Sequence, residues 1–166
     1  VIEADITASG TSGGGRVFIG GDHQGGNQYP AAAQTFIGPE VTITANAERA
    51  GDGGQVNIWA EESTQYFGEV VARGGRLGGQ GGMVEVSGKR SLGFWGNVDV
   101  SAPRGSWGSL LLDPTNIRIV DGDSGNNDAQ VLDGEIFSGE GDTRFILSET
   151  VLEALSGSAN IELQAT

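Results

Sequence analysis

The sequence contains no cysteine, one methionine and one histidine, and it is poor in basic residues. The absence of cysteine excludes disulfide bonds and thiolate metal sites. Nine lysine and arginine residues against 22 aspartate and glutamate residues give a formal net charge of −13 at pH 7. Such a charge repels phosphate backbones and anionic lipid surfaces, so nucleic acid is not an expected partner.

Long apolar runs are also missing. No stretch approaches the ~18 consecutive apolar residues that a transmembrane helix needs, and no basic-then-apolar signal sequence opens the chain. Val1 stands where an initiator methionine would. We therefore expect a fragment of a longer protein, with no transmembrane segment in these residues.

Glycine, in contrast, is abundant, with 30 of the 166 residues against a usual share of ~7%. The glycines are not spaced at every third residue, which excludes collagen. Repeated tight corners explain them better. With 37% hydrophobic residues, the chain has enough apolar material for the core of one domain.

A short phrase of paired glycines followed by alternating apolar residues recurs along the chain. Its copies lie at residues 14–19, 53–58, 81–86 and, in a weaker form, 108–112. Val56 and Val84 hold the same place in the phrase and lie 28 residues apart, while the first interval is longer because residues 22–34 are inserted. Two further phrases recur at a similar period, so each repeat carries three short strands.

This repeat predicts an all-β fold. Three short strands with glycine corners leave no room for βαβ crossovers, and a hairpin meander would not require identical phrases at one period. A parallel β-solenoid, or β-helix, meets both constraints if each repeat of about 28 residues forms one rung of three strands. Equivalent residues then stack at ~4.8 Å in columns.

The expected inward columns are aliphatic: Val17, Val56, Val84 and Leu110; Ile19, Ile58, Val86 and Leu112; and Val41, Val70 and Val98. Val100 is expected inside as well. Alternation then directs Asn57, Glu85 and Asp99 outward, and we expect Glu85 and Asp99 to be exposed to solvent.

A further expected column precedes an equivalent glycine in each rung and contains one aliphatic and two aromatic residues, Ile37, Phe67 and Trp95. It is either an aromatic stack that stabilises the solenoid or an exposed ladder on which sugars stack. Trp59 also points outward by alternation. Trp59 and Trp95 are therefore the candidate contacts for a glycan or a protein partner.

The repeat loosens after Pro114. We assign residues 1–120 to solenoid rungs, and residues 121–166 to an acidic loop, short strands, a helix at 148–156 and a terminal strand that continue the solenoid. In the acidic loop, Asp121, Asp123 and Asp128 are candidate calcium ligands, but the sequence lacks the glycine and the final carboxylate of an EF-hand. The alternative is a solvated acidic turn that binds no ion. Calcium is therefore a candidate ligand of this loop, and no other cofactor is expected.

Catalytic motifs are sparse. His23 is the sole histidine, it lies in the inserted segment, and it has no serine elbow or cysteine beside it in the sequence. The carboxylates Glu85, Asp99 and Asp113 belong to different strands, and Asp99 with Arg104 is the nearest approach to an acid–base pair. We expect no enzyme. The alternative is a glycan-active β-helix lyase or hydrolase.

Several segments resemble the repeat region of filamentous-haemagglutinin-type exoproteins, which are secreted adhesins of the two-partner (TpsA-like) route. They are GGRVFIGGDHQGGN, GDGGQVNIWAEEST, GGMVEVSGKRSLGFWGNVDVSAPRG, SLLLDPTNIRIVDG and the tail SETVLEALSGSANIELQAT. The resemblance covers nearly the whole chain, but the secretion domain of the family is not in it, so we expect an interior or C-terminal portion.

The resemblance implies a right-handed parallel β-helix that a dedicated outer-membrane barrel exports to the bacterial outer surface or the medium. Its expected partners are that secretion barrel and a glycan or protein on a host or neighbouring cell. End-to-end self-association into an extracellular filament is a variant of this reading. No family residue with an assigned catalytic or ligand role maps onto this sequence.

Overall fold

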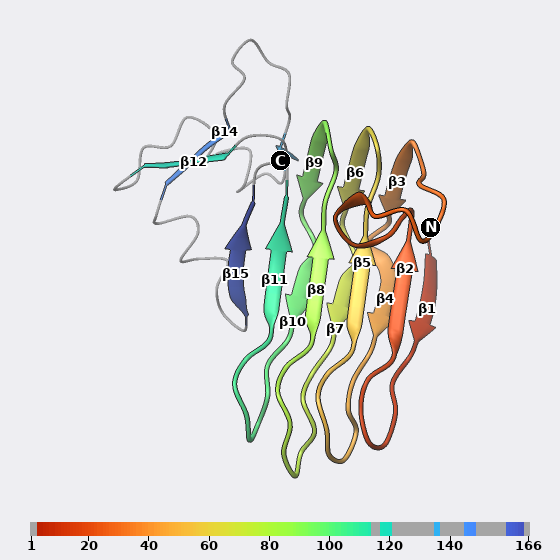
Figure 1. The fold of residues 1–166 in the computed structure, drawn as a ribbon, viewed down its shortest axis with the longest axis vertical. Helices are drawn as coiled ribbons and strands as arrows, with labels where there is room; N and C mark the ends of the chain where they lie inside the picture. Colours follow the sequence, from red (N-terminus) through yellow and green to blue (C-terminus); the bar gives the residue numbers. More distant parts are fainter. Residues whose placement is uncertain (1–2, 114–116, 121–134, 137–144, 149–158, 165–166) are drawn as a thin grey trace.

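The fold is that of a computed structural model, which describes residues 3–113, 117–120, 135–136, 145–148 and 159–164. These residues form parallel β-sheets, and the one helical element among them is the short 3-10 helix η1 (His23–Gly25). Figure 1 shows the strands of successive repeats lying side by side. The all-β, parallel architecture expected from the repeat is confirmed.

Three sheets take one strand each from every repeat. The β1 sheet contains β1 (Glu3–Thr7), β4 (Glu40–Thr44), β7 (Glu69–Val71) and β10 (Asn97–Asp99). The β8 sheet contains β2 (Arg16–Ile19), β5 (Gln55–Ile58), β8 (Met83–Val86), β11 (Ser109–Leu112) and β15 (Asn160–Leu163). The β9 sheet contains β3 (Gln34–Ile37), β6 (Ser63–Tyr66), β9 (Ser91–Phe94) and β13 (Glu135–Ile136). A separate pair joins β12 (Ile117–Val120) to β14 (Phe145–Ser148).

The strand register follows the sequence repeat in the β8 sheet. Val56 of β5 pairs with Val17 on one side and Val84 on the other, and Val84 pairs with Leu110. We call one set of successive strands, such as β5, β6 and β7, a rung. The tail rejoins this sheet, because β15 pairs in parallel with β11, whereas β13 runs antiparallel to β9.

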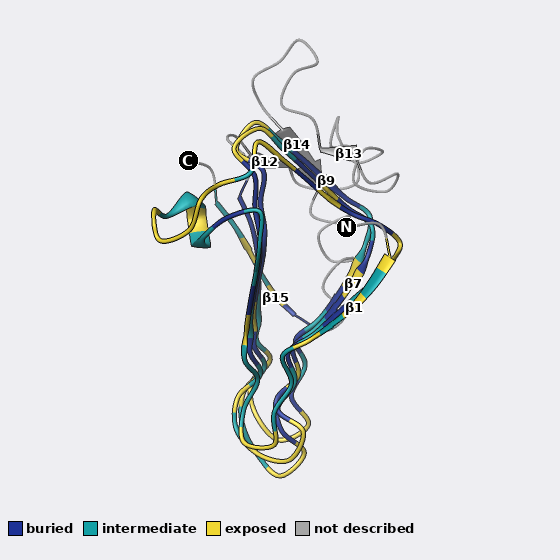
Figure 2. Ribbon diagram, turned by 90° about the vertical axis from the view of Figure 1, so that its right-hand side faces the viewer, coloured by how far each residue is buried: buried dark blue, intermediate teal, exposed yellow. Residues whose placement is uncertain are grey.

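The three sheets face a common apolar core (Figure 2). Valines 84, 86, 98 and 100 are buried, as expected from the repeat. The column predicted from Val41 is wrong, because Val70 pairs with Ile43 instead. Strand β4 starts two residues earlier than β7, and its extra residues Glu40 and Val41 pair with β1. Matching Val41 with Val70 therefore gave the wrong register for β4, whereas the expected match of Val70 with Val98 is confirmed.

The paired glycines allow adjacent rungs to approach closely. A Cβ atom on Gly54 would overlap the carbonyl oxygen of Gly15 in the preceding rung, and a Cβ on Gly82 would overlap that of Gly54. Any other residue would push the rungs apart at this corner. The Gly-Gly phrase is thus the signature of a backbone-to-backbone contact that recurs at every rung.

Several sequence expectations fall outside the described residues. The acidic loop with Asp121, Asp123 and Asp128 lies there, and so does the expected helix at 148–156 except for its first residue. That residue, Ser148, ends strand β14. In the described part of the chain, no helix is long and apolar enough to cross a membrane.

Replacement of a core residue in the central rung should destabilise the whole stack. Ile58 is fully buried, so Ile58→Ala should lower the free energy of unfolding by about 2–5 kcal/mol, through lost burial and the cavity left behind. The matched control is Gln55→Ala at the partly exposed start of the same strand, which should stay within ~0.5 kcal/mol of wild type. Urea unfolding followed by far-UV circular dichroism measures both. Equal midpoints for the two variants would contradict the assigned register.

Candidate functional site

The inserted segment folds back over the outer face of the β8 sheet. Residues 20–33, called the inserted loop below, leave β2 and return to β3, and they cross in front of β5 and β8 (Figure 1). Asp22 begins η1, since its carboxylate accepts hydrogen bonds from the backbone N–H groups of His23 (2.8 Å) and Gln28 (3.2 Å). The loop therefore has its own local structure.

A polar group that we call the Glu85 cluster joins the loop to the sheet beneath it. It consists of His23 and Gln24 from the loop and the buried residues Asn57 and Glu85 from the sheet. The Glu85 carboxylate is 0% exposed. Its Oε2 lies 2.5 Å from His23 Nδ1 and accepts from Asn57 Nδ2 at 2.6 Å, and the Gln24 backbone N–H contacts both oxygens at 3.0 and 3.1 Å. Donors thus surround a carboxylate that burial would otherwise strongly destabilise.

The cluster also fixes the groups around the carboxylate. The Asn57 amide must present its nitrogen to Glu85, because its oxygen would be repelled there. Its Oδ1 is then left without a hydrogen-bond partner among the described residues. Gln24 adopts the left-handed conformation, with φ of 50°, which costs a non-glycine residue roughly 1–2 kcal/mol. The hydrogen bonds from its N–H to Glu85 offset that strain.

The expected exposure of Glu85 is corrected here. Glu85 and Asn57 do point away from the core, as alternation predicted, but Glu85 is not exposed and Asn57 is only 1% exposed. The loop shields both from water. The Gln24 side chain extends the contact by donating to the Gln164 side chain, which follows β15. The loop thereby links the first rungs to the tail.

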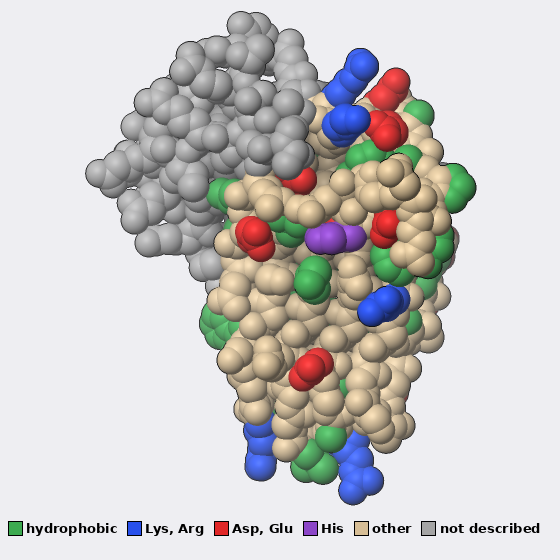
Figure 3. Space-filling model, viewed as in Figure 1, with side chains coloured by type: hydrophobic (Ala, Val, Ile, Leu, Met, Phe, Trp, Pro, Cys, Tyr) green, Lys and Arg blue, Asp and Glu red, His purple; other side chains and the backbone are tan. Residues whose placement is uncertain are grey.

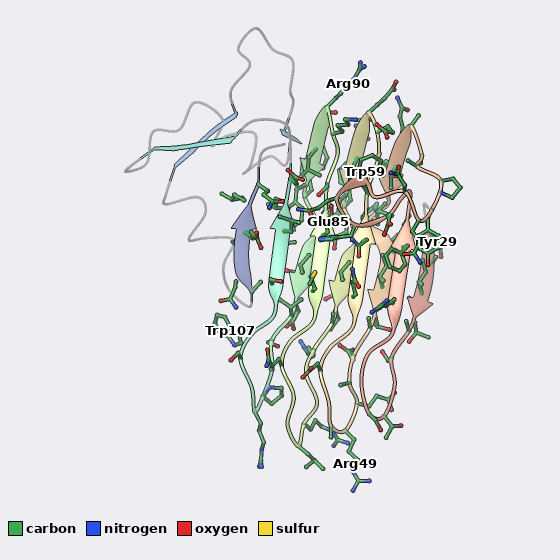
Figure 4. All side chains as sticks on the ribbon, viewed as in Figure 1. Tyr29, Arg49, Trp59, Glu85, Arg90 and Trp107 are labelled. Atoms are coloured by element: carbon green, nitrogen blue, oxygen red, sulfur yellow. The ribbon has the colours of Figure 1, made fainter. Side chains whose placement is uncertain are left out.

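Trp59, a candidate partner contact, lies under the same loop (Figure 4). It is 5% exposed. Gly21 and Gly25 lie against its ring so closely that a Cβ atom on either would come within 2.7 and 2.6 Å of ring carbons. Trp59 therefore acts as a packing surface for the loop, and its ring offers little area to a ligand.

Trp95, the other candidate, stacks on Phe67 at the outside of the β9 sheet. Their ring centroids are 4.2 Å apart with an interplanar angle of 5°, and Phe36 packs on Phe67 at 5.5 Å. The stacking of Phe67 and Trp95 expected from the sequence is confirmed, but Ile37 does not belong to that column, because it pairs with Tyr66, which in turn pairs with Phe94, inside the core. Phe67 and Trp95 each come one residue later and turn outward. One face of Trp95 is thus occupied by Phe67.

The remaining carboxylates do not gather around Glu85. Asp99, named with Arg104 as the nearest approach to an acid–base pair, instead bonds Arg73, whose Nε donates to Oδ2 at 2.6 Å. Burial alone would raise the pKa of Asp99, but the hydrogen bonds from Arg73 and Ser101 outweigh it and hold the pKa below its ordinary value. The Asp99 side chain is only 13% exposed, so its expected exposure is also wrong. Within the described ranges, no group of three or more His, Cys, Asp or Glu residues could hold a metal.

Chemically, the Glu85 cluster is suited to holding a loop. Every donor around Glu85 comes from the loop or from the neighbouring strand, and no path from solvent reaches its oxygens, since its exposure is zero. The His23 side chain is 37% exposed, so only the far side of its ring faces water.

Sequence reasoning treated His23 as an isolated surface residue and so missed its partner, 62 positions away. One signal was present. Asn57 and Glu85 are polar residues at stacked positions of adjacent rungs, next to an insertion long enough to cover them. A polar pair in such a column predicts a covering segment with hydrogen-bond donors.

Removal of the Glu85 carboxylate should release the loop. Glu85→Ala leaves the His23 ring and the Gln24 N–H without their acceptor. We therefore expect the free energy of unfolding to fall by about 1–3 kcal/mol and backbone hydrogen exchange at residues 22–26 to become faster. Exchange followed by mass spectrometry measures this. Glu61→Ala is the control, since Glu61 is a surface partner of Lys89 at 3.2 Å worth ~0–1 kcal/mol. Unchanged exchange at residues 22–26 in Glu85→Ala would refute the role given to the cluster.

Comparison with known proteins gives no assignment for this geometry. No protein-family model matches the chain, and no curated protein matches it either. The resemblance to exoprotein repeats therefore stays an expectation that depends on the quoted segments of the sequence.

Proposed function

We propose that the chain is a structural segment of a right-handed parallel β-helix in a secreted or cell-surface bacterial exoprotein of the filamentous-haemagglutinin type. The central rung carries this proposal. Each of its strands, β5, β6 and β7, pairs in parallel with the equivalent strands of the rungs before and after it. A stack bonded on all three sides is a stiff spacer, because bending it would break hydrogen bonds in every sheet.

The outer faces and the ends of the stack are the parts that meet other molecules. In the described part of the chain, β1, β2 and β3 are each paired on one side, with β4, β5 and β6. Such edges accept a further rung, either from the same protein or from a second copy. Head-to-tail growth into an extracellular filament is the variant of the proposal that uses these edges.

The charge and the composition support an extracellular role. A net charge of −13 keeps a surface protein soluble and repels anionic membranes. A chain without cysteine forms no disulfide before or during export, which suits passage in an unfolded state through an outer-membrane secretion barrel. That barrel, and a glycan or protein on another cell, are the partners in this proposal.

Immunogold electron microscopy of the producing cells tests the location. Antibodies raised against this chain should label the outside of intact, unpermeabilised cells, or material shed from them, because the segment would be exported with its parent protein. Labelled filaments would support the head-to-tail variant. Antibodies against a cytoplasmic protein serve as the control and should not label intact cells. Labelling by the chain's antibodies that appears only after permeabilisation would contradict the proposal.

A glycan-active β-helix enzyme is the second candidate. The contact between His23 and Glu85 suggests it, because a histidine beside a carboxylate is a common arrangement for acid–base catalysis. Glycosidases normally use two carboxylates that flank the bond to be cleaved, whereas Glu85 is paired with a histidine and amides and is closed to solvent. The contact therefore fits a structural role better.

Incubation with a panel of neutral and acidic polysaccharides decides between the two. We expect no release of reducing ends or unsaturated sugars above the buffer blank. Release that is lost in Glu85→Gln, and kept in the surface control Glu61→Gln, would establish the enzyme instead.

A further inference from the structure

A shallow groove runs across the β8 sheet at the starts of its strands, below the inserted loop. Its volume is about 480 Å³. The glycine pairs that precede β2, β5 and β8 form its floor, and the first residue of each strand projects beside them: Arg16, Gln55, Met83, Ser109 and Asn160. These five residues are register partners in consecutive strands. The groove therefore follows the stacking direction.

The residues that line the groove are suited to an uncharged ligand. Gln55, Ser109 and Asn160 offer amide and hydroxyl groups, which both donate and accept hydrogen bonds. Arg16 is the one charged side chain among the described residues of the lining, and no Asp or Glu belongs to it. In Figure 3 the front of the sheet below the purple imidazole is mostly tan, with some blue, green and red side chains among the tan atoms. A polyanion would meet a protein of net charge −13, and a cation would find no carboxylate here.

Trp107 lines the groove beside Ser109 and Asn160. It is 48% exposed, and its carbonyl oxygen accepts a hydrogen bond from Asn160 Nδ2 at 3.0 Å, which ties its corner to β15. Figure 4 shows it at the outer margin of the sheet. Trp59 is buried and Trp95 is stacked on Phe67, so Trp107 is the tryptophan with an open ring. An aromatic face of this kind packs against the C–H groups of a sugar ring.

We propose that this groove binds a linear, uncharged polysaccharide strand that lies along the stacking direction, with one sugar ring on Trp107. Side chains repeat along the groove at the strand spacing of ~4.8 Å, and the polar ones lie on both sides of Met83, where they can meet different sugar units of an extended chain. The glycine floor lets the strand lie close to the backbone. This inference rests on the proposed function and names the ligand class of the exported segment.

Native electrophoresis in gels that contain a dissolved polysaccharide tests the proposal. Hydroxyethyl cellulose, xyloglucan and galactomannan are the uncharged probes, and alginate is the acidic one. At least one uncharged probe should retard the wild-type chain, and alginate should not. Trp107→Ala should raise the apparent dissociation constant about tenfold, as expected for the loss of one aromatic stacking contact.

A matched pair of variants separates the groove from the rest of the surface. Gln55→Glu and Gln65→Glu make the same change of charge in the same rung, but Gln55 lines the groove while Gln65 is exposed on β6 of the β9 sheet. Gln55→Glu should weaken the retardation, and Gln65→Glu should behave as wild type. Because both are partly or fully exposed, far-UV circular dichroism should show unchanged folds.

Three results would overturn the proposal: no retardation by any uncharged probe, retardation by alginate as strong as by the uncharged probes, or equal retardation of wild type, Trp107→Ala and Gln55→Glu. None of them bears on the immunogold result, which does not depend on glycan binding. Surface labelling without polysaccharide binding would therefore reject the groove and leave the proposed function standing. Polysaccharide binding without surface labelling would support the groove and contradict the proposed function.

Discussion

The parallel, in-register stacking of rungs is the constraint on which the rest of this structure depends. Each strand of the central rung bonds to the strand before and the strand after it, so a residue is always next to its equivalents. Side chains must therefore match along the stack, which explains the aliphatic columns. The same spacing forces glycine at the corner where Gly15, Gly54 and Gly82 meet. The aliphatic columns and the glycines at the corners therefore both result from the close, in-register spacing of the rungs.

The stacking also explains how the outer face acquires buried polar groups. Matched columns bring Asn57 beside Glu85, and a bare carboxylate and amide there would simply be solvated. The inserted loop changes their surroundings by covering them, and its own donors, His23 and Gln24, then satisfy the carboxylate. Loop and cluster are thus interdependent, because neither the strained Gln24 nor the buried Glu85 is favourable without the other.

The three tryptophans show how position on the stack divides similar side chains among different roles. Trp59 follows β5 and is covered by the loop, whereas Trp95 continues an aromatic stack between rungs. Trp107 lies at a corner before β11 and is 48% exposed, and among the described residues neither the inserted loop nor another aromatic ring packs on it. The groove beside it is lined mainly by glycines and uncharged polar groups, together with Arg16 and Met83, on a protein that is acidic overall. The outer faces of one repetitive fold are therefore chemically distinct.

The sequence by itself determined the class of fold, the period and most of the core, because backbone spacing imposes a repeat that is visible in Val56, Val84 and the paired glycines. It did not determine the register where strand lengths differ, as at Val41. Nor did it reveal the Glu85 cluster or the accessibility of the tryptophans. The cluster and the burial of Trp59 depend on where the inserted loop lies, and the covering of Trp95 depends on its stacking against Phe67. Contacts between residues 62 positions apart leave no periodic trace, so only the tertiary structure decided them.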